Sequence, residues 1–286
     1  MMKVVSFLIP LAAWCLVSYV PWVWHPQFKI TDQGGTERYA VGNIVDRAVY
    51  KQEQQELTRA GKALMQGTLT NPIFLPQPHE VARSIYLSFT TEPARRGAPW
   101  LHERILQSVS VLAKAFALAV LIAVPLGLLC GTFDLFSKLI EPFVDFFRYM
   151  PAPAFGGLMV SIFSMGDAPK VAIIFIGLFF NLLLVTANTT RYVDGALLEA
   201  AQTLGATRWR LLTRVVLPGA LPMLFNDLRI TLGFGWIYLA VAEIVGAFSG
   251  LSEFIDQNRK FRNYANVYAG IFIFGAIGFI TDQILA

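Results

Sequence analysis

Six apolar blocks dominate the pattern of hydrophobic and polar positions along the chain. They cover residues 4–24, 105–130, 149–166, 171–190, 219–248 and 264–281. A helix needs roughly 20 mainly apolar residues to cross about 30 Å of hydrocarbon. The pattern therefore predicts an all-α integral membrane protein with about six transmembrane helices. The first, within residues 1–24, is too long for the core of a secretory signal, so we expect it to be retained as a span.

Residues 25–104 differ from the rest because charges are scattered throughout them. The stretch 51–67 favours a polar helix within this soluble insertion. Three prolines between residues 72 and 78 then impose extended backbone. Residues 79–89 are typical of a short amphipathic helix that lies against the bilayer or the bundle. Its predicted apolar face comprises Val81, Ile85 and Phe89, with Ala82 and Tyr86. The core transmembrane domain follows at residues 105–286.

The composition indicates that the chain lies in lipid and argues against a nucleic-acid partner. Hydrophobic residues make up 55% of the chain and charged residues 15%, whereas soluble domains usually carry about 25% charged residues. The formal net charge is +4, but no basic cluster is interleaved with solvent-facing aromatic residues. We therefore expect no nucleic-acid partner and interpret the excess as orientation charge at the membrane surface.

Motifs for enzymatic chemistry are absent from the sequence. Gly61-Lys62 is followed by Ala63 and lacks the earlier glycine of a phosphate-binding loop, so the chain itself should not hydrolyse ATP. His25, His79 and His102 are widely separated and belong to no metal-ligand spacing. No Gly-x-Ser-x-Gly elbow supports a hydrolase. We expect a non-enzymatic chain without a bound metal or cofactor.

The segment 191–218 is too polar to span a membrane and too regular to be a loose linker. It predicts two short helices. Asp194 can cap the first, and Gly205 supplies the left-handed residue that stops it. Thr207 can cap the second, which should end at Pro218 because proline breaks a helix. The expected amphipathic face of this second helix comprises Trp209, Leu211, Leu212 and Val215.

One spacing in this segment resembles the EAA loop of importer-type ABC permeases. It consists of Glu199-Ala200-Ala201, three residues, Gly205, nine residues, Val215, one residue and Leu217-Pro218. In that family the loop forms a cytoplasmic coupling-helix hairpin, here 193–217, that docks into the ATPase subunit. The resemblance assigns ATPase coupling to Glu199, Ala200, Ala201, Gly205, Leu217 and Pro218. The alternative is an ordinary helical hairpin between two spans.

Further motifs extend the resemblance from about Phe74 to the C-terminus and favour the branch that imports nitrate, sulfonates, taurine or bicarbonate. They are Leu75-Pro76-Gln77-Pro78-His79-Glu80-Val81, Phe147-Arg148-Tyr149-Met150-Pro151-Ala152-Pro153, Leu217-Pro218-Gly219-Ala220-Leu221-Pro222, and Leu228-Arg229-Ile230 with Val241-Ala242-Glu243. The implied fold is that of type I ABC importer permeases. The implied complex contains a second permease copy, two cytosolic ATPase subunits that bind ATP and Mg, and a periplasmic substrate-binding protein.

The resemblance places the chain in the bacterial inner membrane with its N-terminus in the cytoplasm. Segments 131–148 and 191–218 then face the cytoplasm, and 25–104 is periplasmic. This insertion departs from the branch, in which the first span is usually followed closely by Leu75-Pro76. The chain also ends at Ala286 without the usual basic tail, which fits either an absent or a truncated tail.

A small oxyanion inside the membrane needs donors that replace its water. The sequence hypothesis for the substrate pathway comprises Arg148, Met150, Pro151, Asn181 and Tyr238. Alternatives are an interfacial role for Arg148 and a helix–helix hydrogen bond for Asn181. Arg229 and Glu243 fit structural ion pairs or dimer contacts better than substrate binding.

The resulting interpretation is the membrane-spanning permease subunit of an ABC importer for a small oxyanion, acting as a homodimer. Two alternatives stay open: an ATP-independent channel or membrane assembly protein, and an ABC importer for a vitamin precursor. The sequence does not identify the solute or the role of the insertion. It also does not distinguish a homodimer from a heterodimer.

Overall fold

The computed structural model describes residues 2–20, 23–72, 74–93, 97–246 and 249–285. The chain divides into two compact units. The first comprises residues 1–92 and 257–270, and the second comprises residues 93–256 and 271–286.

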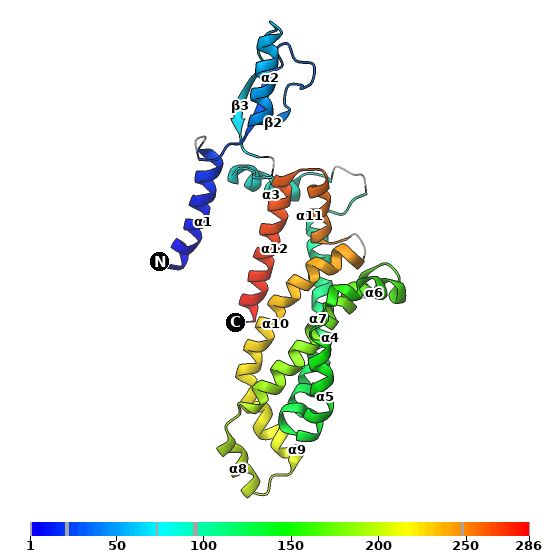
Figure 1. Cartoon of the computed structure of the whole chain (residues 1–286). Helices are drawn as coiled ribbons and strands as arrows, with labels where there is room; N and C mark the ends of the chain where they lie inside the picture. Colours follow the sequence, from blue (N-terminus) through cyan, green and yellow to red (C-terminus); the bar gives the residue numbers. More distant parts are fainter. Residues whose placement is uncertain (1, 21–22, 73, 94–96, 247–248, 286) are drawn as a thin grey trace. The chain divides into compact units, whose positions relative to one another are not determined.

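The first unit combines helices with a small sheet (Figure 1). Its elements are α1 (Met2–Tyr19), β1 (Gln27–Asp32), β2 (Ile44–Asp46), α2 (Arg47–Arg59), β3 (Gln66–Thr70) and α3 (Pro78–Thr90). The three strands are antiparallel in the order β2-β1-β3. The polar helix expected at 51–67 corresponds to α2, which begins and ends earlier than predicted. The hydrophobic pattern did not predict the three strands, because each is short and partly exposed.

The insertion has its own small core. Ile30, Val45, Leu57 and Met65 are buried there, and the ring of Phe28 stacks on Tyr50 of α2 at 4.2 Å. Glu53, also buried, accepts a hydrogen bond from Thr36 Oγ1 at 2.7 Å. The exposed Arg38 lies 3.3 Å from Glu53 and 2.9 Å from Glu56. These carboxylates, Glu53 foremost, raise the pKa of Arg38.

Helix α3 begins as expected after the prolines, with Pro78 in its first turn and Glu80 Oε2 accepting the Gln77 N–H at 2.9 Å. Val81 of the predicted apolar face is buried, whereas Tyr86 and Phe89 of that face are exposed. Ser84, a polar position, is also buried, because its hydroxyl hydrogen-bonds to Asn266 of α12.

The second unit is helical. Its elements are α4 (Leu101–Thr132), α5 (Asp134–Phe147), η1 (Ala152–Phe155), α6 (Gly156–Phe163), α7 (Asp167–Arg191), α8 (Gly195–Thr203), α9 (Arg208–Leu211), η2 (Leu212–Val216), α10 (Leu217–Gly246) and α11 (Leu251–Lys260). The last four residues of α11 belong to the first unit, as does the beginning of α12 (Tyr264–Ile284).

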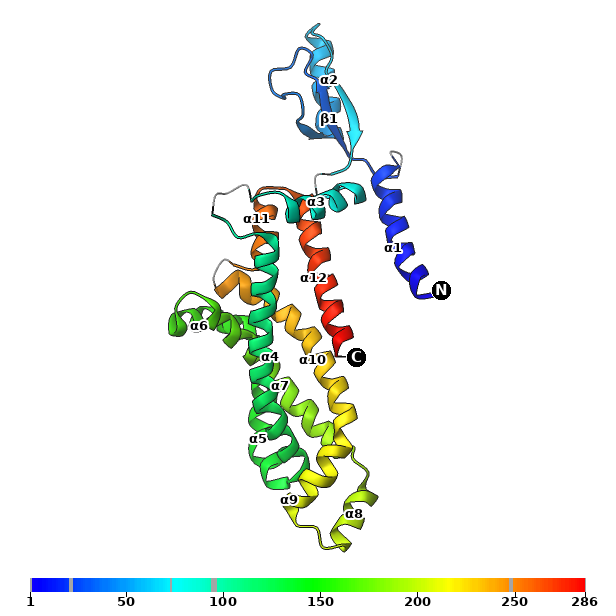
Figure 2. The same cartoon turned by 180° about the vertical axis from the view of Figure 1, so that it is seen from behind.

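Four helical segments in the described ranges are long and apolar enough to cross a membrane: 101–132, 167–191, 208–245 and 264–284. Two shorter apolar segments, Leu8–Tyr19 and Ala152–Phe163, correspond to the other two blocks. Figures 1 and 2 show that α4 and α7 run antiparallel to α10, and that the turn into α5 lies at the same end as α8 and α9. The bundle of apolar helices confirms the predicted fold class.

The block 149–166 was wrongly expected to form one long span. It divides into the short helices η1 and α6 because Pro151 and Pro153 interrupt the chain. Segment 131–148 forms α5, which packs against α4 and α7 and buries Val144. The elements η1 and α6 thus occupy the block that the sequence pattern assigned to one helix.

Small residues bring α4 and α7 close together. Ala115, Ala119 and Ala123 are fully buried at four-residue spacing along α4, and Gly127 and Gly131 continue the same line. A Cβ added at Gly127 would lie 2.7 Å from the backbone oxygen of Leu183, and one at Gly131 would lie 2.6 Å from that of Ala187. Both distances are shorter than those that real Cβ atoms show. The backbones can approach this closely only because side chains are missing.

We expect Gly131→Ala to lower stability by about 1–3 kcal/mol, because the new methyl group has no space and the helices must separate. The matched control is Gly275→Ala on α12, where an added Cβ meets nothing within 4 Å. That variant should be neutral or slightly stabilising because alanine favours helix. Thermal unfolding in detergent micelles measures both, and an unchanged midpoint for Gly131→Ala would contradict the close-packing account.

Candidate functional site

The hairpin at 193–217 begins with a capped helix. Asp194 Oδ1 accepts a hydrogen bond from Ala196 N at 2.9 Å, which confirms the predicted cap of α8. Glu199 and Ala200 lie on the exposed surface of α8, and Ala201 is half-buried. Ala201 packs with Leu198 against a small apolar cluster formed by α4, α9, η2 and α10. One face of α8 is therefore anchored while Glu199 remains accessible.

Gly205 ends α8 as predicted. Its φ of +81° lies in the left-handed region, and a Cβ there would meet nothing within 4 Å. The N–H of Gly205 donates to the carbonyl of Gln202 at 2.9 Å, and the N–H of Ala206 donates to that of Ala201 at 3.0 Å. This pair of bonds is the Schellman motif. The turn is thus fixed by its own backbone and leaves an open surface around Gly205.

The second predicted helix does not end at Pro218. After its cap by Thr207 Oγ1, which accepts from Arg210 N at 3.4 Å, α9 passes through η2 into α10 without interruption. In η2, a π-helical segment, the Leu217 N–H reaches back five residues to Leu212. Pro218 lacks an N–H, but it stands in the first turn of α10, immediately after this wider segment. Leu217 and Pro218 therefore join the hairpin to a span.

The buried face of this second helix also differs from the expected one. Leu211, Leu212 and Val216 are buried in the apolar cluster, whereas Trp209 is 66% exposed. The continuous helix explains the change, because α10 sets which side of α9 faces α4. Two other large apolar side chains of the hairpin are exposed, Leu197 at 54% and Leu204 at 88%.

Four of the five predicted pathway residues line one cavity of about 280 Å³ in the second unit. Arg148 ends α5, Met150 follows it, Asn181 lies mid-way along α7, and Tyr238 lies on α10. Pro151 does not line the cavity. The other lining residues are Phe147, Tyr149, Ile176, Gly177, Leu178, Phe180 and Phe234. None of these seven belongs to the predicted pathway set, because an apolar residue or a glycine within an apolar block carries no signal of its own, and Tyr149 was noted only as part of the Phe147–Pro153 motif.

The polar groups of the cavity fall into two kinds. Arg148 is partly neutralised, because its Nε lies 3.1 Å from Asp145 Oδ1 and its Nη2 donates to the Tyr149 hydroxyl at 2.9 Å. Asn181 and Tyr238, in contrast, form no side-chain hydrogen bond with any residue that the structure describes. The expected alternative of a helix–helix bond for Asn181 is therefore not seen in this part of the chain. Both groups are available to a solute.

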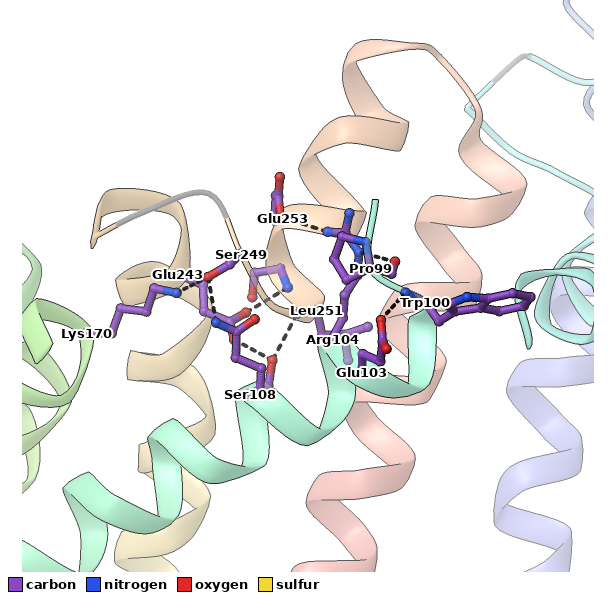
Figure 3. A network of polar contacts seen from close by, with 12 residues as sticks. Pro99, Trp100, Glu103, Arg104, Ser108, Lys170, Glu243, Ser249, Leu251 and Glu253 are labelled. Carbon is purple, nitrogen blue, oxygen red and sulfur yellow. Dashed lines mark hydrogen bonds and ion pairs between the residues drawn. The ribbon is translucent and has the colours of Figure 1, made fainter. Parts of the chain in front are cut away.

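A buried polar network joins α4, α7 and α10 to Ser249 and to the first turn of α11 (Figure 3). Glu243 accepts hydrogen bonds from Ser108 Oγ and, at 2.8 Å, from Ser252 N. Ser108 Oγ also accepts from Leu251 N at 2.9 Å. Lys170, fully buried, donates to Ser249 Oγ. Glu243 thus has structural partners, as charged residues in apolar helices usually do.

Two further ion pairs join helices of the second unit. Arg104 Nη1 of α4 lies 2.8 Å from Glu253 Oε2 of α11, and both side chains are buried. Arg229 of α10 pairs with Asp282 of α12 through two nitrogen–oxygen contacts. The expectation that Arg229 and Glu243 find structural partners is confirmed, although they do not pair with each other.

Comparison with known proteins decides the family. Residues 123–286, more than half of the chain, match the family described as "Binding-protein-dependent transport system inner membrane component". The chain belongs to this family. The predicted resemblance to importer permeases is thereby confirmed, and the chain is a membrane-embedded transport subunit.

Individual relatives agree with this assignment. The chain is 30% identical over 214 residues to the taurine transport system permease protein TauC of Escherichia coli (strain K12), covering 75% of this chain and 77% of TauC. It is 35% identical over 171 residues to the putative aliphatic sulfonates transport permease protein SsuC of Bacillus subtilis (strain 168), covering 58% of this chain and 62% of SsuC. The predicted branch is confirmed.

A solved structure supports the fold. The inward-facing MetNI methionine ABC transporter superimposes with a TM-score of 0.55 and 21% sequence identity, covering 67% of this chain and 99% of that chain. The likeness concerns the helical arrangement of this permease, and at this identity it extends to the fold alone.

We expect Arg104→Met in this permease to cost about 3–5 kcal/mol, because it removes the buried guanidinium that pairs with the Glu253 carboxylate. The double variant Arg104→Met/Glu253→Met should recover most of that loss, since it removes both charges. Arg83→Met, at an exposed position of α3, is the control and should change stability little. Denaturant unfolding in micelles completes the double-mutant cycle, and additive losses would show that the two side chains do not interact.

Proposed function

We propose that this permease pairs with a second copy, docks an ATPase subunit on its α8–α9 hairpin, and passes a small anion delivered by a periplasmic binding protein. The solute class proposed is an oxyanion such as nitrate, taurine or another sulfonate, or bicarbonate. In this scheme the N-terminus and the hairpin lie in the cytoplasm of a bacterium, and the insertion 25–104 lies outside. ATP and Mg are bound by the partner ATPase.

The observation that carries the docking proposal is the exposed apolar tip of an otherwise anchored hairpin. Leu197, Leu204 and Trp209 expose more than half of their surface, although the adjoining face of α8 and α9 is packed against the bundle. Apolar side chains concentrated on a rigid surface are typical of a protein interface. The Schellman turn at Gly205 leaves room for a neighbour, since no side chain covers it.

Charge supports the same proposal. Arg208, Arg210 and Arg214 are exposed and form no ion pair within the described part of the chain. Glu199 is also exposed. A partner groove with carboxylates opposite the arginines and a cation opposite Glu199 would complement this tip.

The competing proposal is an ATP-independent channel or assembly protein in which the hairpin is only structural. An apolar tip without a partner would then face water, which costs free energy and promotes aggregation. A structural hairpin also needs no open turn at Gly205. Both features favour docking over a purely structural hairpin. Among transporters, an importer for a vitamin precursor is the second candidate.

We expect Gly205→Trp to abolish co-purification of the ATPase and ATP-driven uptake, because the indole occupies the open surface where the partner docks. Gly205→Asn is the matched control, since asparagine tolerates the left-handed conformation with a small side chain. The complex is reconstituted into liposomes with its ATPase and binding protein, and ATP hydrolysis and uptake of labelled nitrate, taurine and bicarbonate are measured.

The hairpin variants separate docking from folding. Gly205→Trp should keep a thermal unfolding midpoint within a few degrees of Gly205→Asn, because both place a residue at positive φ in open space. Passive solute flux with no associated ATPase in the unmodified protein would overturn the importer proposal. Unchanged ATP-driven uptake by Gly205→Trp would instead show that the ATPase docks on another surface.

A further inference from the structure

Five of the eleven residues that line the cavity are aromatic. Phe147 of α5 and Phe180 of α7 stack with ring centroids 5.4 Å apart, and Tyr149, Phe234 and Tyr238 complete the lining. Ring faces cannot donate the hydrogen bonds that an inorganic oxyanion loses with its water. They do favour burial of carbon, which gains from leaving water. The wall therefore fits a solute that has an organic portion.

The polar groups lie where an anionic head needs them. Arg148 supplies a guanidinium, held by Asp145 and by the Tyr149 ring 4.8 Å away. The free amide of Asn181 and the hydroxyl of Tyr238 line the same cavity. Because Asp145 offsets part of the charge of Arg148, a monoanion matches this set better than a dianion. A volume of about 280 Å³ suits a small molecule.

One wall of the cavity depends on a missing side chain. An ideal Cβ at Gly177 would lie 2.9 Å from three ring carbons of Tyr238, well inside van der Waals contact. The Tyr238 ring therefore rests directly on the backbone of α7. Any side chain at residue 177 must displace the ring, and both residues line the cavity.

We propose that Tyr238, seated on Gly177, is the size-selective wall of the cavity, which accepts the carbon portion of a small organic monoanion. This inference rests on the proposed function, because it takes the cavity as part of the solute path. Gly177 acts as a positioning residue through the ring, whereas Tyr238 and Asn181 touch the solute. The chain thereby discriminates among anions after the binding protein has delivered them.

The test compares alkanesulfonates of one, two and four carbons with nitrate and bicarbonate. The complete complex, with its ATPase and one unchanged binding protein, is placed in liposomes, and ATP-dependent uptake of each labelled anion is measured at saturating concentration. Since the binding protein is constant, a changed ratio between long and short sulfonates reports on the permease. For the unmodified protein we expect sulfonate uptake at least tenfold above that of nitrate or bicarbonate.

We expect Gly177→Ala to change the ratio of four-carbon to one-carbon uptake at least fivefold, because the displaced ring reshapes the wall. Gly233→Ala on α10 is the matched control, since a Cβ there meets nothing within 4 Å, and it should keep the original ratio. The double variant Gly177→Ala/Tyr238→Ala removes the clashing ring and should relax the discrimination between chain lengths. Tyr238→Phe keeps the ring and should preserve the length ratio while lowering uptake of all sulfonates.

The outcomes separate this inference from the function on which it rests. ATP-driven uptake dominated by nitrate or bicarbonate, or an identical length ratio in Gly177→Ala and Gly233→Ala, would overturn the size-selective wall and leave the importer intact. Absence of ATP-dependent uptake of every anion, together with no ATPase association, would overturn both. Tyr238→Ala alone, which removes the ring without crowding α7, keeps the test decisive if Gly177→Ala does not fold.

Discussion

The close approach of α4 and α7 is the constraint on which the rest of the second unit depends. Ala115, Ala119 and Ala123, followed by Gly127 and Gly131, let two backbones meet along much of their length. In lipid, where hydrophobic burial gives little drive for association, such contact supplies the packing energy. With this pair fixed, α10 packs across α7 and places Tyr238 against it. The cavity is a consequence of that packing.

Polar contacts secure both ends of this pair. At one end Glu243 and Lys170 hydrogen-bond to serines of α4 and of the segment before α11. Near the hairpin, Arg191 pairs with Glu141 of α5 and donates to Ser137 at 3.1 Å. Buried or partly buried polar groups of this kind specify one arrangement, because a shifted helix would leave them without partners. The cavity lined by Asn181 and Tyr238 lies between these two polar regions.

Local signals in the sequence predicted local structure correctly. The Asp194 cap and the Gly205 stop follow from bonds within a few residues, so sequence alone determines them. Whether a helix ends at Pro218 depends on the span that follows. Tertiary packing holds that span, and the helix continues through Pro218. Gly177 could not be recognised as a cavity residue, since its role exists only when Tyr238 lies on it. A contact between residues that are distant in the sequence produces no recognisable residue spacing.

The uninterrupted helix from Arg208 to the end of α10 has a mechanical consequence. At about 1.5 Å per residue, Trp209 and Tyr238 lie about 44 Å apart on a single rod. A continuous helix is stiffer than a loop, so a small change of tilt at one end displaces the other end sideways. The π-helical segment Leu212–Val216 is the one place in this rod where the hydrogen-bond pitch changes. The protein thus carries one continuous helix that links the exposed hairpin at Trp209 to the cavity wall at Tyr238.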